Sequence, residues 1–232
     1  MARHMTVPTP SGLVHMAFTD RDDGDFRVDQ GAQVETLRRS HLDHPWTWLR
    51  QTHGKQVVTV CHAGQWAGAE ADAAVTVNSH CPLAVTTADC APVVLIADTG
   101  LGVIHAGWKG VVGGVIEAAA SKLLELGATP HAAFVGPCIS AQAYEFADTE
   151  LGLVVGATDQ SVVAQTSWGT EGLDLARAVS IVLEKSGWPS PNVIGECTSG
   201  PNWFSHRTRG DTGRQTTVAW IDNDATSEAM LR

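Results

Sequence analysis

Short apolar runs, rather than long amphipathic repeats, dominate the middle of this chain. Runs that are rich in β-branched residues and bounded by Gly, Pro, Asn or Asp are typical of strands. They predict strands at residues 56–62, 71–77, 83–87, 93–97, 102–105, 132–135, 193–196 and 216–221. The run at 93–96 is apolar throughout, which indicates a strand that is covered on both faces.

Helical patterns are fewer, and a glycine follows each of the two longer ones. Residues 111–126 are rich in Ala, Leu and Glu, and apolar residues recur at helical spacing over 175–183. A short helix is expected at 33–42, whereas the first thirty residues are polar and are expected to form turns around the acidic stretch 20–25. Strands and helices interleave unevenly, so we expect a mixed α/β fold in which a mixed sheet lies between helical layers.

Length and charge narrow the class of protein. A chain of 232 residues fits one α/β domain, so residues 1–232 are expected to form a single domain. The formal net charge of −10, without a Lys/Arg cluster, argues against binding to nucleic acid or to an anionic membrane. The longest apolar run has about eight residues and the N-terminus lacks an apolar signal core, so we expect a cytoplasmic protein. The five cysteines contain no CxxC pair and are expected to be reduced thiols, one or two of them reactive or metal-bound.

Three short segments at predicted strand ends combine residues that carry chemistry: 51–54, 87–92 and 105–110. They contain His53, Cys90 and His105, and two imidazoles with one thiolate form a good ligand set for Zn²⁺. The fourth position would stay open, as in catalytic zinc sites. The spacing of these residues matches no short metal motif. In the alternative reading, Cys90 is a small buried residue and the histidines are ordinary loop residues.

Candidate anion-binding residues lie near the same strand ends. Lys109 stands among glycines at the start of a predicted helix, where free backbone amides favour an anion, although a tight turn with an exposed lysine gives the same pattern. Cys138 follows a strand and could bring a second thiol to the site, or could pack in the core. Arg207 and Arg214 lie in a polar loop and could bind an oxyanion through paired hydrogen bonds, or could be solvated.

The segments together resemble the YfiH-like family, also called the laccase-domain or multicopper polyphenol oxidase domain family, which includes the peptidoglycan editing factor. The resemblance runs from about residue 45 to residue 221, and residues 1–44 look divergent. The family motifs occur here in order as Gln51-Thr52-His53-Gly54, Thr87-Ala88-Asp89-Cys90, His105-Ala106-Gly107-Trp108-Lys109-Gly110, Gly136-Pro137-Cys138-Ile139 with Tyr144-Glu145, Phe204-Ser205-His206-Arg207 and Thr212-Gly213-Arg214. Where the family usually has two adjacent arginines and an aspartate, this chain has Arg207-Thr208-Arg209.

The resemblance implies a three-layer α/β/α fold and a zinc ion held by His53, Cys90 and His105. It also implies purine nucleoside phosphorolysis, with adenosine, inosine, guanosine and methylthioadenosine as substrates, and adenosine deamination. We therefore expect a zinc-dependent purine nucleoside phosphorylase and deaminase in which the three ligands are catalytic. Its partners would be purine nucleosides and phosphate, and the protein would be a monomer or homodimer.

Three other functions compete with this one. Cys90, activated by His105, could be the nucleophile of an amide hydrolase that edits peptidoglycan precursors. Copper oxidase activity is less favoured, because the ten histidines are scattered singly and lack the clustered motifs of multicopper sites. A non-catalytic binding role would leave the open metal position unexplained.

Overall fold

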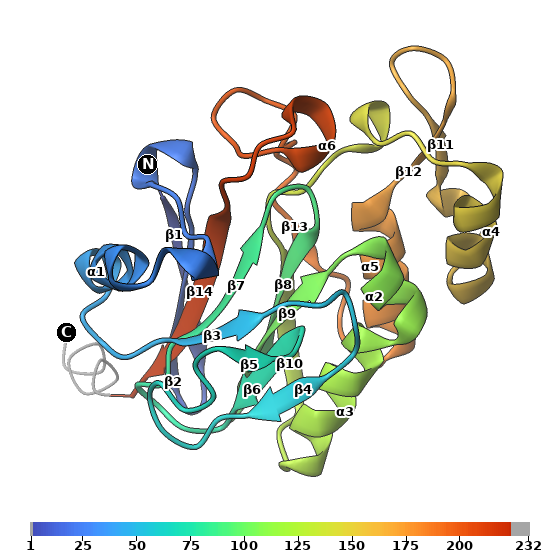
Figure 1. Ribbon diagram of the computed structural model, residues 1–232. Coiled ribbons are helices and arrows are strands. Elements are labelled where there is room, and N and C mark those ends of the chain that lie inside the picture. The colour runs from blue at the N-terminus through green and yellow to red at the C-terminus, as the bar shows by residue number, and fades with distance from the viewer. Residues whose placement is uncertain (1, 224–232) are drawn as a thin grey trace.

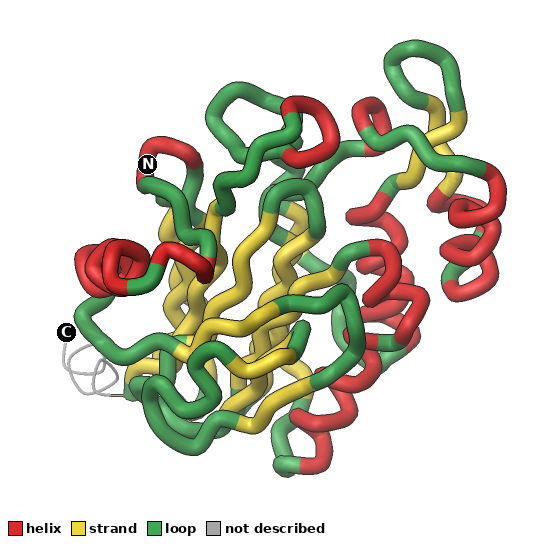
Figure 2. Tube along the Cα trace, viewed as in Figure 1, coloured by secondary structure: helices red, strands yellow, loops and turns green. Residues whose placement is uncertain are grey.

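Two six-stranded sheets lie face to face at the centre of the molecule, and helices cover their outer faces (Figure 1). The computed structural model describes residues 2–223. Figure 2 shows the strands gathered in the middle of the molecule with the helices outside them. Within the described residues, no helix is long and apolar enough to cross a membrane.

The first sheet has the strand order β1-β2-β14-β7-β3-β5. Its strands are β1 (Arg3–Thr9), β2 (Gly12–Phe18), β14 (Gln215–Asp222), β7 (Leu83–Thr87), β3 (Thr47–Arg50) and β5 (Ala69–Glu70). The strands from β1 to β7 pair antiparallel, and β3 runs parallel to both of its neighbours.

The second sheet has the order β13-β10-β8-β9-β6-β4 and is also mixed. Its strands are β13 (Asn192–Val193), β10 (Pro130–Val135), β8 (Ala91–Ala97), β9 (Leu101–Ala106), β6 (Ala73–Thr76) and β4 (Val57–Thr59). A separate hairpin joins β11 (Val163–Gln165) to β12 (Glu171–Leu173). The helices are α1 (Ala32–His41), α2 (Trp108–Gly113), α3 (Val115–Glu125), α4 (Asp148–Ala157), α5 (Leu175–Lys185) and α6 (His206–Arg209).

The alternation of side chains along β8 explains why this strand is buried on both faces. Val93 and Leu95 belong to the core beneath the helices α3 and α5, whereas Val94 and Ile96 belong to the core between the two sheets. All four are fully buried. Each such side chain stabilises the fold by roughly 1.5–3 kcal/mol relative to leaving it in water.

A smaller core closes the other side of the first sheet. Phe26, Val34 of α1 and Trp46 pack there against Ala17 of β2 and Ala84 of β7. The layers therefore run from α1 through the two sheets to the helices α2, α3 and α5.

The mixed α/β class in a single domain is confirmed, but the expected single central sheet is in fact two sheets, so the sandwich has four layers rather than three. The apolar pattern marks strands correctly without reporting which strands pair. The interface between the sheets is made from alternate residues of strands far apart in the sequence, such as Met16, Leu83 and Val103.

The expected helix at 111–126 is divided into α2 and α3. Gly114 lies between them with φ of 87°, a left-handed conformation that ends one helix and begins the next. The short helix and the strand at 83–87 lie where they are expected, as α1 and β7.

The expectation of turns throughout the first thirty residues is wrong, because β1 and β2 form a hairpin there. One face of β2 carries Val14, Met16 and Phe18, and the opposite face carries Leu13, His15 and Ala17. Polar residues in β1 make this alternation of faces hard to see in the sequence. Turns and short 3₁₀ helices do follow, from residue 20 to residue 30.

Candidate metal centre

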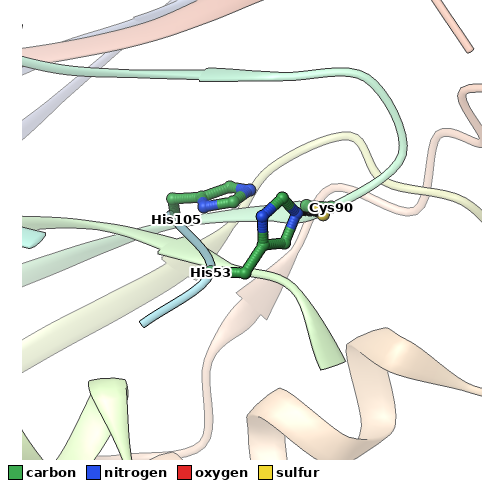
Figure 3. A group of neighbouring side chains, drawn as sticks. All are labelled: His53, Cys90 and His105. Carbon is green, nitrogen blue, oxygen red and sulfur yellow. Dashed lines mark hydrogen bonds between the residues drawn. The ribbon is translucent and has the colours of Figure 1, made fainter. Parts of the chain in front are cut away.

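The candidate ligands converge where the chain passes between the two sheets. His53 lies between β3 of the first sheet and β4 of the second, and Cys90 lies between β7 of the first sheet and β8 of the second. His105 belongs to β9, where it pairs with Pro92 of β8 and so lies near Cys90. The ligand atoms of the three residues lie within 4.8 Å of one another (Figure 3).

The three side chains present different degrees of exposure. His105 is 4 % exposed, Cys90 is half-buried and His53 is exposed. Cys90 Sγ lies 3.8 Å from His53 Nε2, and the two imidazole rings meet edge to face with centroids 4.7 Å apart. The set is therefore closed on the His105 side and open on the side of His53.

A buried carboxylate, Asp72, holds both histidines. It has no exposed surface, and its Oδ1 accepts hydrogen bonds from His105 Nδ1 at 2.8 Å and from the His53 backbone amide at 3.0 Å. Its Oδ2 accepts from the amides of Thr52 and Gly54 and from the Thr52 hydroxyl. An ionised carboxylate can only accept, so His105 keeps a proton on Nδ1, and Nε2 is the nitrogen that a metal would bind in place of its proton.

These contacts set the charge states of the site. Burial raises the pKa of Asp72, but the His105 hydrogen bond and the backbone amides outweigh it and lower that pKa to about 2. Burial likewise raises the pKa of Cys90, yet His105 and His53 lower it to about 6. Burial lowers the pKa of His105, whereas Cys90 and Asp72 raise it to about 9. Cys90 is thus a thiolate at neutral pH, the form that binds metals.

The depressed pKa of Asp72 has a consequence for stability. A carboxyl whose pKa is lower in the folded than in the unfolded chain stabilises the fold above its ordinary pKa of about 3.9. Asp72 therefore contributes fully at neutral pH, and its contribution is lost as the pH falls from about 4 through about 2.

Two non-glycine residues beside the ligands have left-handed backbone conformations. His53 has φ of 58° and Asp89, which precedes Cys90, has φ of 95°. Such residues cost on the order of 1–3 kcal/mol and persist only where their surroundings fix them. Here the hydrogen bonds of Asp72 fix His53, and those of Asp89 fix the turn that carries Cys90.

Asp89 joins the C-terminal loop to this turn. Its carboxylate accepts from the hydroxyls of Thr198 and Ser205, both at 2.7 Å, and from the Arg207 amide at 2.6 Å. Since Ser205 and Arg207 lie between β13 and β14, a third connection between the sheets reaches the site.

A cavity of about 820 Å³ opens beside the ligands. Its lining includes His53, Cys90 and His105 together with the cations Arg27, Lys109, Arg207 and Arg214, so the predicted anion-binding residues Lys109, Arg207 and Arg214 do lie at the site. A volume of this size is in the range of small-molecule sites.

The cations differ in how much of their hydrogen-bonding capacity is already used. Arg214 donates to three backbone carbonyls, and Arg207 donates to the carbonyl of Glu145 while its guanidinium lies over the Tyr144 ring. Among the described residues, Lys109 Nζ has neither a hydrogen-bond acceptor nor an ion-pair partner, and it lies 5.6 Å from the centroid of the Trp108 ring. Lys109 is therefore the cation most available to an anionic ligand.

Cys138 does not reach this cavity. It is buried in the core beneath the helices and lines a different, smaller cavity with Cys197. Its position fits the alternative reading, core packing, and burial raises the pKa of its thiol.

Asp72, Tyr144 and Arg27 also contribute to the site, although no sequence pattern gives any of them a role there. The one available signal for Asp72 was a single carboxylate inside the apolar run 71–77, where an unpaired charge is costly. Arg27 comes from the N-terminal part that matched the family motifs poorly.

Comparisons with known proteins agree on one family. Residues 9–222 match the family described as multi-copper polyphenol oxidoreductase laccase. A Streptomyces griseus protein named purine nucleoside phosphorylase is 35 % identical over 252 residues, covering 96 % of this chain and 100 % of that protein. A Mycobacterium tuberculosis protein with the same enzyme name is 35 % identical over 232 residues, covering 95 % and 92 %.

Solved structures share the fold. The Bacillus licheniformis hypothetical protein YfiH superposes with a TM-score of 0.80 at 22 % identity, covering 95 % of this chain and 99 % of that one. YlmD from Geobacillus stearothermophilus gives a TM-score of 0.77 at 23 % identity, covering 92 % and 94 %.

Replacing Asp72 by Asn tests its role in holding the ligands. The Asn side chain has one oxygen and an NH2 group, so it can accept hydrogen bonds at only one of the two positions. Buried donors at the other position, such as Gly54 N–H, then lose their acceptor. We expect the free energy of unfolding to fall by about 1–3 kcal/mol and zinc affinity to fall roughly 10- to 100-fold. Competition with a chromophoric chelator measures the affinity. Asp98→Asn is the control, because Asp98 accepts from two backbone amides away from the site. Equal zinc affinity in the two variants would refute the role of Asp72.

Gly107 leaves room for the ligands, and Gly107→Ala removes that room. A Cβ at this position would lie 2.9 Å from His53 Cδ2 and 3.0 Å from Cys90 Sγ. We expect weaker zinc binding in the same chelator assay. Gly113→Ala is the control, since its Cβ would meet nothing within 4 Å. It should keep wild-type affinity and gain about 0.4–1 kcal/mol of stability. Unchanged affinity in Gly107→Ala would contradict the close packing of the ligands.

Proposed function

Given that this chain belongs to the multi-copper polyphenol oxidoreductase laccase family, as its ordered motifs indicated, we propose that it is a zinc-dependent purine nucleoside phosphorylase that also deaminates adenosine. The observation that carries the proposal is the His53, Cys90 and His105 set opening on a cavity lined by cations. The enzyme names of the similar proteins from Streptomyces and Mycobacterium support the reaction class.

The donor set fits zinc. Two imidazole nitrogens and one thiolate are zinc ligands, and Asp72 behind His105 supplies the carboxylate that commonly orients a metal-binding histidine. Zinc bound by these residues would supply Lewis acidity at the wall of the cavity. Two histidines and a cysteine also occur in blue-copper sites, but those transfer electrons and do not need a substrate cavity of this size. The described residues contain only one group of three or more potential ligands, whereas multicopper sites need several.

The cavity offers separate surfaces for the two substrates of phosphorolysis. Lys109 and Arg207 would bind phosphate and orient one oxygen toward C1′ of the ribose. Trp108 also lines the cavity and would offer an aromatic ring to the purine. In deamination, C6 of adenosine would face the ligand set, where a water oxygen would bond to C6 and the amino group would leave as ammonia. Adenosine, inosine, guanosine and methylthioadenosine are the proposed nucleosides.

A product assay with adenosine tests both activities. We expect zinc-loaded protein to release adenine only when phosphate is present, and to form inosine whether or not phosphate is present. Liquid chromatography separates adenine, inosine and hypoxanthine. If none of these products forms with fully metal-loaded protein, the proposed function fails.

The same assay on Lys109→Gln separates the phosphate site from the metal site. Loss of a charged hydrogen bond worth about 1.5–3 kcal/mol should lower kcat/KM for phosphate roughly 10- to 100-fold. Inosine formation should stay near wild type. Lys122→Gln, at a partly exposed position of α3 paired with Glu125, is the matched control.

A second candidate function is a Cys90-dependent amide hydrolase that edits peptidoglycan precursors. It is favoured by one observation: the lowered pKa of Cys90 and the raised pKa of His105 describe a thiolate beside an imidazolium, as in thiol hydrolases. A metal and a free nucleophile would compete for the same sulfur.

Cys90→Ser and alkylation distinguish the two functions. For the zinc enzyme, we expect the wild type to hold about one zinc per chain, zinc to protect Cys90 from iodoacetamide, and Cys90→Ser to lose metal and nucleoside activity together. Exposed Cys61 provides the control variant Cys61→Ser, which should keep both. Wild-type protein that never holds stoichiometric zinc, and whose amide hydrolysis is abolished by alkylation, would favour the hydrolase.

A further inference from the structure

Two cysteines outside the metal centre lie opposite each other on neighbouring backbone segments. Cys138 and Cys197 form an isolated parallel bridge, in which Cys138 N–H donates to the Glu196 carbonyl and Thr198 N–H donates to the Cys138 carbonyl. Neighbouring strands lie about 4.8 Å apart, and disulfide-linked residues have Cα atoms about 4.4–6.8 Å apart. Both thiols are free and line a cavity of about 120 Å³. The backbone therefore already has a spacing that a disulfide accepts.

The Cys197 sulfur sits among hydrogen-bond donors. Its Sγ accepts from the amide of Ser140 at 3.2 Å and from the amide of Ser199 at 3.4 Å, and the Ser199 hydroxyl lies 3.0 Å away. Burial raises the pKa of Cys197, but these donors outweigh it, and the pKa lies below its ordinary value. Cys197 is also only half-buried, so a small reagent in the cavity can reach it.

Cys138 differs from Cys197 in each of these respects. It is 6 % exposed, and burial holds the pKa of its thiol well above the ordinary value. This contrast assigns different roles to the two residues, because the more thiolate-like and more accessible sulfur reacts first with an oxidant. Cys138 is then the neighbouring thiol that resolves the product.

We propose that Cys138 and Cys197 form an oxidation site for hydroperoxides, in which Cys197 reacts with the peroxide and Cys138 then closes an intramolecular disulfide. The Cys197 thiolate attacks one peroxide oxygen, the O–O bond breaks, and a sulfenic acid and hydroxide form. Cys138 sulfur attacks the sulfenic sulfur, the S–S bond forms, and hydroxide leaves with the Cys138 proton as water. Overall, two thiols and one hydrogen peroxide give one disulfide and two waters. The thiols lose two electrons and the peroxide gains them.

The pair lies directly behind the turn that carries Cys90. Thr198, next to Cys197, donates its hydroxyl to the Asp89 carboxylate, and Ile139, next to Cys138, donates its amide to the Asp89 carbonyl. The disulfide would therefore link the two segments that hold Asp89. Its formation does not depend on which reaction the metal centre catalyses.

Peptide mapping after peroxide treatment tests the proposal. The full chain carrying Cys61→Ser is loaded with zinc, which shields Cys90, and is treated with one to five equivalents of hydrogen peroxide. Remaining thiols are blocked with N-ethylmaleimide before digestion with trypsin without reductant. Cys138 and Cys197 fall in separate tryptic peptides, 123–177 and 186–207. We expect these two peptides to be linked, with the loss of two hydrogens, and to separate after treatment with a thiol reductant.

Two variants assign the order of the steps. In Cys138→Ala, the sulfenic acid of Cys197 should persist and be trapped by dimedone. In Cys197→Ser, neither the linked peptide nor a dimedone adduct at Cys138 should form. The proposal is overturned if Cys138 and Cys197 remain alkylatable while Cys81 or Cys90 is oxidised, or if Cys138→Ala traps no adduct at Cys197. If a variant fails to fold, the Cys61→Ser protein alone tests the proposal. Linked peptides 123–177 and 186–207 support it, and their absence overturns it.

Discussion

The carboxylate of Asp72 is the constraint on which the rest of the site depends. This fully buried carboxylate accepts hydrogen bonds from the His105 ring and from the His53 backbone amide. It also accepts them from the amides of Thr52 and Gly54 and from the Thr52 hydroxyl. It fixes which nitrogen of His105 can bind a metal, and its hydrogen bond to the His53 amide supports the left-handed conformation of His53. A positive metal ion would in turn compensate the buried negative charge, so carboxylate and metal stabilise each other.

The position of the site follows from the two-sheet architecture. Three connections between the sheets meet there, and they carry His53, Cys90 and Arg207 respectively. The chain has a net charge of −10, yet cations line the cavity beside the ligands. Such an arrangement would attract an anionic ligand to one place on an otherwise repulsive surface.

The convergence of His53, Cys90 and His105 could be predicted because their short motifs at strand ends occur in the order of one family, whereas their spacing alone left the alternative reading open. Asp72 could not, because its partners are brought to it by folding and one carboxylate within the apolar run 71–77 reports none of them. The strands were mostly visible from their apolar pattern, whereas their division into two sheets depends on pairings such as β14 with β2 and β7. Local sequence carries little information about such contacts. Cys138 shows the opposite error. It lies in a family motif, but its side chain lines a different cavity from the one beside the ligands.

X-ray absorption at the zinc edge of the metal-loaded protein determines whether His53, Cys90 and His105 build a single open zinc site. We expect about one zinc per chain, with one sulfur at about 2.3 Å, two imidazole nitrogens at about 2.0–2.1 Å and one further light atom. The sulfur should disappear from the first shell, or zinc binding be lost, in Cys90→Ser. A spectrum without sulfur, a shell of four protein ligands, or copper as the stoichiometric metal would contradict it.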